Sequence, residues 1–301
     1  MADLHVLISA GASPAAHNII QHLKNLGCRV CAIDANEKAL PLAAAVADQA
    51  VLSPLAGDPA YIPFIRKKIE ESDLFIPFID EEIDRLLCHG DPVLWDKCLL
   101  PPMETTRECL YKTRFQSFCK AHGLPVARET QQPPAVFKPD LGRGGKGVVF
   151  VDNTEDFECL SRSNGVVQEW IAGEEFTVDA LFSKQGDLIR MSARQRDAAA
   201  GVSTIGTIAD PEPFEPLVQE IARALKFSYL INLQAIRDSS GRLHIIEINP
   251  RIAGSIMFTV LSGLDFLKGA IDIYQGRPPE LRDQQQRIRV IRYWSEHVEA
   301  L

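Results

Sequence analysis

The chain has 301 residues, of which 46% are hydrophobic and 24% charged, and its formal net charge is −8. This composition is ordinary for a soluble globular protein, and the length allows one large core or several smaller ones. The acidic balance argues against a general nucleic-acid binder, because phosphate backbones are bound by a net basic face.

The N-terminus and the cysteines indicate a cytoplasmic protein. Residues 1–5 lack the positive region and the long apolar stretch of a secretory signal. The sequence contains no run of about 18 apolar residues, so neither a membrane span nor a membrane partner is expected. The seven cysteines are scattered, as is typical of reduced thiols. Cys28 and Cys31 form a CxxC, but in a predicted strand they would point to opposite faces. The oligomeric state is left open, with a homo-oligomer as one alternative.

The first hundred residues alternate predicted strands and helices. Strands are expected at residues 4–10, 29–33, 51–53 and 74–79. The first helix is expected to have Ser13 as N-cap and Pro14 at its first position, and a later helix follows Asp58-Pro59. This alternation predicts a parallel sheet with helices on both faces, and therefore an α/β domain at residues 1–100.

Beyond the linker Leu100-Pro101-Pro102 the pattern becomes α+β. One helix is expected at residues 107–120, where Gly123 closes it, and strands then dominate to about residue 210. The remaining elements are a short helix near residues 154–160, an amphipathic helix at 214–227, and a hairpin of strands 229–237 and 242–249.

A glycine-rich run, Phe137 to Gly147, is the sharpest local motif. Its backbone N–H groups can turn toward phosphate oxygens, and basic residues lie among its glycines. The loop is Gly142, Arg143, Gly144, Gly145, Lys146 and Gly147, and Lys138 precedes it. A flexible surface hairpin is the alternative, but such a hairpin needs no basic residues. The run is not a Walker A motif, because no GxxxxGK[ST] is present.

The C-terminal hairpin has a four-residue loop, 239–242, so Asp238 is expected to pair with Leu243. Counting outward gives two further opposed pairs: Gln234 with Glu247, and Asn232 with Asn249. One carboxylate and three amides then share one face, while Ile246 and Ile248 point to the core. An all-oxygen cluster suits Mg²⁺, and Arg251 follows it. The alternative is a solvated polar face, and a register slip would remove Gln234 from the cluster.

The segment Val166 to Phe176 predicts a strand, a turn and a strand. By itself it indicates only ordinary acidic surface positions. Backbone groups around Glu169–Ile171 could bind an adenine edge, and Glu175 a ribose hydroxyl.

These motifs occur together in the order seen in ATP-grasp enzymes: Lys112 in a helix, Lys138 before GRGGKG, QEWIxGxEF, and NxQ followed by ExNxR. The whole chain resembles the carbamoyl-phosphate synthase large-chain-like branch. The resemblance implies a pre-ATP-grasp (Rossmann-like) domain at residues 1–100, and an ATP-grasp domain at 101–301 with a small lid subdomain at about 113–180.

The resemblance implies a role for each matched position. Lys112 and Lys138 would bind the nucleotide phosphates, and the loop Gly142–Gly147 would close over them. The other implied sites are adenine at Glu169, Trp170 and Ile171; ribose at Glu175; Mg²⁺, or Mn²⁺ in its place, at Gln234, Glu247 and Asn249; and the transferring phosphoryl group at Arg251, with Lys138.

The chain also departs from the family. Only residues 130–134 separate the lysine helix from the strand of Lys138, so the lid is trimmed. Tyr111 precedes Lys112, where the family usually has Asp or Asn. A single ATP-grasp unit is present, whereas carbamoyl-phosphate synthesis uses two, so that reaction is not assigned.

The expected function is an ATP- and Mg²⁺-dependent ligase that activates a small carboxylate as an acyl phosphate for attack by an amine, or less often a thiol. One alternative is an ATP-binding or regulatory module without ligase turnover. Another is a dinucleotide-dependent oxidoreductase, suggested by Asp34 at the end of the second strand. The turn at residues 10–16 does not support it, because it has one glycine and no GxGxxG.

Substrate choice is expected at the carboxyl ends of the N-terminal strands, where ligands of open α/β sheets bind. The strand 74–79 runs into Asp80-Glu81-Glu82, beside the turn of Ser13. Asp80 or Glu81 is expected to bind a cationic group, such as the amine of a small substrate. The alternative is that these acids only stabilise the first turn of a helix.

Overall fold

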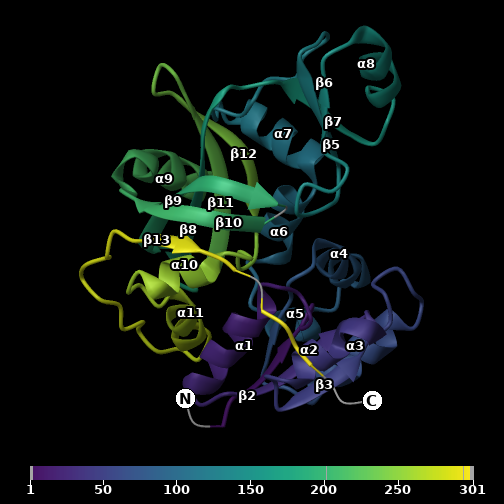
Figure 1. Ribbon diagram of the computed structural model, residues 1–301, viewed down its shortest axis with the longest axis vertical. Coiled ribbons are helices and arrows are strands. Elements are labelled where there is room, and N and C mark those ends of the chain that lie inside the picture. Colours follow the sequence, from purple (N-terminus) through teal and green to yellow (C-terminus); the bar gives the residue numbers. More distant parts are fainter. Residues whose placement is uncertain (1–2, 201, 294, 299–301) are drawn as a thin grey trace.

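The computed structural model describes residues 3–200, 202–293 and 295–298, so the predicted domain ends at 1–2 and 299–301 lie outside the described residues. Three sheets organise this part of the chain (Figure 1). The first is parallel, as predicted, with strand order β3-β2-β1-β4. Its strands are β1 (His5–Ile8), β2 (Arg29–Asp34), β3 (Gln49–Leu52) and β4 (Leu74–Ile76).

Helices cover both faces of this sheet because successive side chains along each strand point to opposite faces, and the side chains on both faces are apolar and buried. Val6 and Ile8 share a core with α1 and α2, while Leu7 packs with α3, α4 and α5 on the other face. The N-terminal helices are α1 (Ala16–Asn25), η1 (Glu37–Ala39), α2 (Leu40–Ala44), α3 (Tyr61–Glu70), α4 (Asp80–His89) and α5 (Pro92–Asp96).

Two predicted boundaries in this domain were wrong. Helix α1 begins at Ala16, and its N-cap position is Ala15, so Ser13 lies in the preceding turn and does not cap the helix. Strand β4 ends at Ile76 and not at residue 79, because the backbone N–H of Phe78 donates to the side chain of Ser9 (2.9 Å). Helix α4 therefore begins directly with Asp80.

The second sheet is antiparallel, with strand order β12-β11-β8-β9-β10-β13. Its strands are β8 (Gly173–Phe182), β9 (Leu188–Ala200), β10 (Val202–Ala209), β11 (Tyr229–Asp238), β12 (Leu243–Asn249) and β13 (Arg289–Ile291). Its helices are α6 (Met103–Leu110), α7 (Lys112–Ala121), η2 (Glu212–Phe214), α9 (Glu215–Ala224), α10 (Ile256–Leu261) and α11 (Phe266–Tyr274). Helices α7 and α9 pack on one face, and α10 and α11 lie on the other.

The single helix expected at residues 107–120 is two helices. The chain breaks at Tyr111, which adopts an extended conformation (φ −92°, ψ 123°) between α6 and α7. Asp140 stabilises the start of the second helix, because its carboxylate accepts from the backbone N–H of Thr113 (2.8 Å) and its carbonyl from that of Lys112 (3.0 Å). The break places Lys112 at the N-terminus of α7.

The third sheet is small, with order β6-β5-β7. It consists of β5 (Ala135–Pro139), β6 (Val149–Val151) and β7 (Gly165–Glu169), with α8 (Thr154–Leu160) beside it. This unit lies at the top of the view in Figure 1, above the large sheet. It is the part of the chain that the sequence assigns to a trimmed lid.

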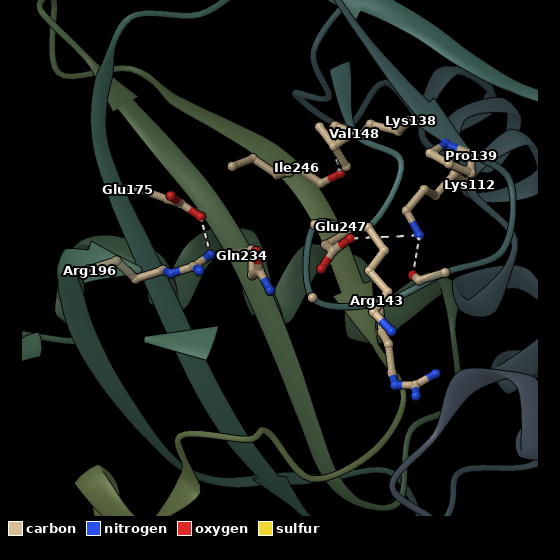
Figure 2. A pocket seen from close by; sticks show the side chains of 14 residues that line it. Lys112, Lys138, Pro139, Arg143, Val148, Glu175, Arg196, Gln234, Ile246 and Glu247 are labelled. Carbon is tan, nitrogen blue, oxygen red and sulfur yellow. Dashed lines mark hydrogen bonds and ion pairs between the residues drawn. The ribbon is translucent and has the colours of Figure 1, made fainter. Parts of the chain in front are cut away.

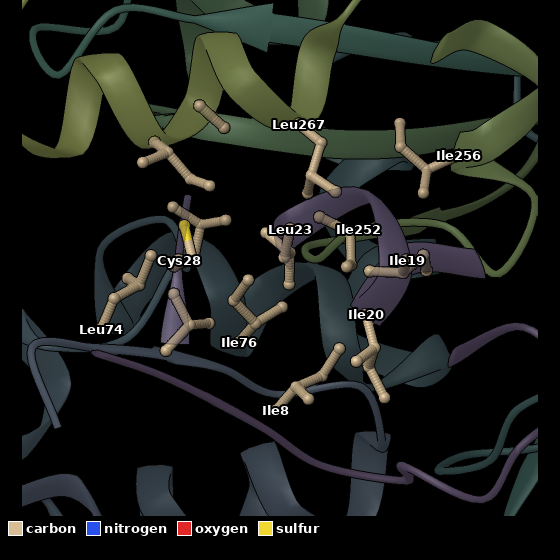
Figure 3. Close-up of a cluster of buried hydrophobic side chains, with 14 of the residues drawn as sticks. Ile8, Ile19, Ile20, Leu23, Cys28, Leu74, Ile76, Ile252, Ile256 and Leu267 are labelled. Atoms are coloured by element: carbon tan, nitrogen blue, oxygen red, sulfur yellow. The ribbon is translucent and has the colours of Figure 1, made fainter. Parts of the chain in front are cut away.

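The N-terminal and C-terminal halves share a hydrophobic core. Ile19, Ile20 and Leu23 of α1 face Ile256 and Leu267 of the C-terminal helices across one cluster (Figure 3). Each of these five side chains is at most 1% exposed. The parallel sheet is therefore fixed against the large sheet, and its carboxyl edge keeps a defined position relative to strand β12.

Candidate active site

A cavity of about 210 Å³ opens between the small sheet, the glycine loop and the large sheet (Figure 2). Its ionisable lining consists of five cationic side chains and two carboxylates. The lining residues are Lys112, Lys138, Pro139, Gly142, Arg143, Gly144, Gly145, Lys146, Val148, Glu175, Arg196, Gln234, Ile246 and Glu247. Most of the residues predicted from the two sharpest motifs therefore meet at one place.

The glycine loop needs glycine for two physical reasons. Gly145 has a positive φ of 71°, which side-chain-bearing residues rarely adopt, and a Cβ on Gly147 would lie 2.7 Å from Cγ of Pro139. Two contacts hold the start of the loop. Lys112 donates to the carbonyl of Gly142 (3.1 Å), and the guanidinium of Arg143 pairs with Glu81 of α4.

Lys138 extends from the end of β5 into the cavity, and its Nζ lies 3.4 Å from the carbonyl oxygen of Ile246. The pKa of Lys138 is lowered to about 8, mainly by burial and also by the nearby charge of Lys112, while the carboxylates of Glu247 and Glu175 oppose this shift. The two carboxylates therefore do not fully offset the cost of burying the charged ammonium group, and a bound anion would stabilise it further.

The hairpin brings Gln234 opposite Glu247 and Asn232 opposite Asn249, as the sequence predicts. The predicted pairing at the loop was wrong, because Leu243 pairs with Arg237 and not with Asp238. A β-bulge between Gln234 and Ala235 absorbs the one-residue difference.

The bulge also reverses the expected burial in β12. Ala235 pairs with Ile245, so Ile246 is the extra residue between two paired positions. Ile245 is fully buried, whereas Ile246 lines the cavity and presents its carbonyl to Lys138. The prediction that Ile246 belongs to the core was therefore wrong, while Ile248 is buried as expected.

Glu247 occupies the centre of the predicted metal cluster. One of its carboxylate oxygens accepts from the side-chain amide of Asn249 (2.9 Å), and the other lies 3.8 Å from Nζ of Lys112. Asn232 does not join them, since it is buried and donates to Asp179 (2.7 Å). Among the described residues, no group of three or more His, Cys, Asp or Glu side chains forms a metal cage.

The remaining oxygen donors fit Mg²⁺ rather than a softer metal. Glu247 supplies a carboxylate, and Gln234 and Asn249 supply amide oxygens on the same face of the hairpin. Mg²⁺ characteristically takes one or two carboxylates from protein, and completes its octahedral shell with water and substrate phosphates.

Arg196 of β9 is a cavity residue that the sequence analysis missed. Its Nη1 atom donates to Oε1 of Gln234 (3.1 Å) and also pairs with the carboxylate of Glu175. Glu175 lies on the neighbouring strand β8, and Gln234 lies on β11, one strand further across the sheet. No local signal marks it, since an isolated arginine in a strand has no motif.

Arg251 and Asp80 form a buried ion pair between the two halves of the chain. Nε of Arg251 donates to Oδ1 of Asp80 (2.5 Å), and Nη2 donates to Oδ1 of Asn249 (3.3 Å). Burial by itself disfavours the charged guanidinium, but the carboxylate of Asp80 raises the pKa of Arg251. Both acids expected to bind substrate thus have a cationic partner within the chain, Asp80 in Arg251 and Glu81 in Arg143.

The residues expected to hold adenine lie outside the lining of this cavity. The carboxylate of Glu169 pairs with Arg128 (3.0 Å) at the end of β7. Trp170 is 53% exposed and contacts the ring of Phe150 edge to face, with centroids 5.0 Å apart. Ile171 follows in the turn before β8.

Asp34 does not face outward as a ribose ligand would. One carboxylate oxygen accepts from the backbone N–H of Ala12 (3.0 Å) and the other from that of Asn36 (2.8 Å). This use of both oxygens within the turn argues against the dinucleotide oxidoreductase considered from the sequence.

No helix in the described part of the chain is long and apolar enough to cross a membrane.

Comparisons with known proteins agree with this geometry. Residues 161–296 match the family described as "ATP-grasp in the biosynthetic pathway with Ter operon". The pyruvate carboxylase of Schizosaccharomyces pombe is 24% identical over 196 residues, which cover 58% of this chain. The match spans only 16% of the length of that relative.

Two solved structures share the fold over most of the chain. An L-amino acid ligase from Bacillus licheniformis is 20% identical, with a TM-score of 0.67, and the match covers 91% of this chain and 74% of that one. The biotin carboxylase domain of the Hydrogenobacter thermophilus 2-oxoglutarate carboxylase, solved with MgADP, ADP and bicarbonate, is 19% identical with a TM-score of 0.68. That match covers 94% of this chain and 71% of that one. The predicted fold, an N-terminal parallel-sheet domain followed by an ATP-grasp domain, is confirmed.

Proposed function

We propose that this chain, which carries an ATP-grasp domain, is an ATP- and Mg²⁺-dependent ligase that activates a small carboxylate as an acyl phosphate for attack by an amine. One observation carries this proposal. Five cations and two carboxylates line the cavity of a chain whose formal net charge is −8. Such a local excess of positive charge favours a polyanion.

The size of the cavity indicates which part of ATP it holds. A volume of about 210 Å³ lies below the range of roughly 300–1,000 Å³ that encloses drug-sized ligands. The cavity therefore suits the triphosphate, with Lys112, Lys138 and the loop Gly142–Gly147 around it. The adenine would extend beyond it toward Glu169, Trp170 and Ile171, with the ribose near Glu175.

Gln234, Glu247 and Asn249 are the proposed Mg²⁺ ligands, and Mn²⁺ has the same preference for oxygen donors. When bound, the metal would neutralise phosphate charge and polarise the oxygens around the transferring phosphorus. The side-chain oxygen of Gln234 already accepts a hydrogen bond from Arg196. To bind Mg²⁺, Gln234 would have to share this oxygen between the metal and Arg196, or give up the hydrogen bond.

The proposed reaction has two steps. A carboxylate oxygen of the acid attacks the γ-phosphorus, the bond to the β-phosphate oxygen breaks, and ADP leaves. An amine nitrogen then attacks the acyl carbon, loses a proton, and releases phosphate. Lys138 and Arg251 would stabilise the negative charge that moves between these oxygens. The glycine loop, joined to α4 through Arg143 and Glu81, would exclude water that otherwise hydrolyses the acyl phosphate.

The same proposal includes four further points about this protein. Its partners are small molecules, it is located in the cytoplasm, its nucleophile is an amine rather than a thiol, and it belongs to the carbamoyl-phosphate synthase-like branch. The domain boundaries at residues 100 and 101, with a lid at about 113–180, are likewise proposed. The small three-stranded sheet with a single helix supports a trimmed lid.

The competing function is an ATP-binding or regulatory module without turnover. A phosphate-release screen separates the two. The chain is incubated with MgATP and a panel of amino acids and small acids, added singly and in pairs. Phosphate release that needs both an acid and an amine supports the ligase. ATP binding without release in any pair would support the regulatory module.

A further inference from the structure

Arg196 bridges two oxygen donors in the wall of the phosphate cavity. The same guanidinium nitrogen, Nη1, donates to Oε1 of Gln234 (3.1 Å) and pairs with the carboxylate of Glu175. All three residues line the cavity. The side chain of Arg196 is 11% exposed and that of Glu175 is 36% exposed, so the guanidinium is largely shielded from bulk solvent. Figure 2 shows these three side chains beside Glu247, which lies opposite Gln234 in the hairpin.

This contact is more than an ordinary ion pair between neighbouring strands. Glu175 lies on β8, next to the strand of Arg196, and opposite charges on adjacent strands often pair. Gln234 lies on β11, one strand further across the sheet. Adjacent strands are about 4.8 Å apart, so β9 and β11 are roughly 10 Å apart. A pair with Glu175 alone would not require the arginine to extend as far as Gln234.

The oxygen donors around the cavity divide into two groups. Glu247 and Asn249 form the first group on β12, where the amide of Asn249 donates to Oε1 of Glu247 (2.9 Å). Glu175 and Gln234 form the second group, which Arg196 holds. Phosphoryl-transfer sites often bind two divalent cations, and each cation needs oxygen ligands that commonly include a carboxylate. Because Arg196 already uses the second group, the first group is the one left for a metal.

The charge of the cavity also favours a single metal ion. Its five cations and two carboxylates leave a net of three positive charges when all are ionised. A triphosphate carries about four negative charges. One Mg²⁺ is therefore enough to neutralise the charge that remains, and a second one would enter a site that is already positive. Like charges repel strongly where water is scarce.

We propose that the guanidinium of Arg196 takes the place of a second metal ion, so that the chain binds ATP with one Mg²⁺, on the side of Glu247 and Asn249. This inference deepens the proposed ligase function and rests on it. Arginine suits the role because it stays charged and has several donors, so it can hold both oxygens and still donate to a phosphate. The amide oxygen of Gln234 has a second lone pair, which can still face the Mg²⁺.

The test counts bound metal and does not depend on turnover. Mn²⁺, which shares the preference of Mg²⁺ for oxygen ligands, is titrated into the full chain at saturating non-hydrolysable ATP analogue, and free Mn²⁺ is measured by electron paramagnetic resonance. One Mn²⁺ per bound nucleotide is expected. Arg196→Gln is expected to bind two, because Glu175 and Gln234 are then free to ligate. A titration without the analogue measures Mn²⁺ held elsewhere on this acidic chain and is subtracted.

Arg143→Gln is the matched control. It removes a cation from the same cavity, but one that pairs with Glu81 and not with Glu175. One Mn²⁺ per nucleotide is expected in this variant. A second Mn²⁺ here would overturn the inference, because the effect would then come from the lost charge and not from the freed oxygens.

The other outcomes separate this inference from the ligase proposal. Two Mn²⁺ per nucleotide in the unmodified chain, or only one in Arg196→Gln, overturns the role of Arg196 and leaves the ligase intact. Failure of the analogue to bind the unmodified chain contradicts the ligase itself. If circular dichroism shows that Arg196→Gln does not fold, Arg196→Met, which keeps the apolar part of the side chain, is measured instead, and the same two counts decide.

Discussion

Arg251, just beyond the end of β12, donates to Asp80 at the start of α4, across the boundary between the two halves of the chain (Nε to Oδ1, 2.5 Å). The two side chains are 10% and 5% exposed. Asp80 therefore holds Arg251 and orients it, and through this contact the N-terminal half would position a residue of the proposed active site.

Asp80→Asn should lower turnover by about tenfold or more, and should change the KM for ATP by less than about twofold. The reason is that Arg251 loses the charge that fixes it. The melting temperature should also fall, because a buried guanidinium loses its partner. Glu104→Gln is the control, since Glu104 is 77% exposed and pairs only with Arg107 on helix α6. A raised KM for the amine with unchanged turnover would instead support the substrate-binding role expected from the sequence.

Binding of an ATP analogue should weaken as the pH rises through about 8. In the nucleotide-free chain the pKa of Lys138 is lowered to about 8, so the ammonium is charged below that pH and neutral above it. A bound triphosphate favours the charged form and raises the pKa, so binding takes up a proton on the alkaline side. Calorimetry in two buffers of different ionisation enthalpy measures this uptake. Lys138→Met should bind about tenfold more weakly and lose the pH dependence.

Glu247→Gln should lower turnover by about a hundredfold or more while the fold survives. The substitution keeps the shape but removes the only carboxylate among the proposed metal ligands. Initial rates at increasing Mg²⁺ measure the effect, and Glu174→Gln is the control on the surface of strand β8. A folded Glu247→Gln protein with near-normal turnover would show that the metal is held elsewhere.

Glu82 should make the stability of the chain depend on pH. It is 4% exposed, and burial raises its pKa from 4.5 to about 7, against favourable contacts with Ser9 and Tyr61. Because the folded pKa lies above the unfolded one, the stabilising contribution is complete below pH 4.5. It is lost as the pH rises through 7.

Glu82→Gln should remove this dependence, which amounts to on the order of 3 kcal/mol across that range. The variant should melt near the wild-type temperature at pH 4.5 and above it at pH 8. Parallel melting curves for both proteins across this range would show that Glu82 ionises normally in the folded chain.

The hairpin shows how far sequence reasoning reached. The pairs Gln234–Glu247 and Asn232–Asn249 were predicted correctly although they were counted from a wrong pairing at the loop, because the bulge shifts the register back by one residue. The bulge at Ile246 was not predicted, since a one-residue bulge leaves the hydrophobic pattern of Ile245, Ile246 and Ile248 almost unchanged. It became visible only through the pairing of both strands.

The sequence by itself determined the alternation of elements, the glycine loop and the order of the motifs, because these depend on residues near one another along the chain. Only the tertiary structure decided which charges meet. Asp80 and Arg251 are 171 residues apart, and Arg196 and Gln234 are 38 apart. No local pattern encodes such contacts. The first arises because the shared core fixes the carboxyl edge of one sheet against the end of another, and the second because β8 lies between β9 and β11 in the large sheet. The partners of the acids in α4 therefore follow from the packing of the two halves.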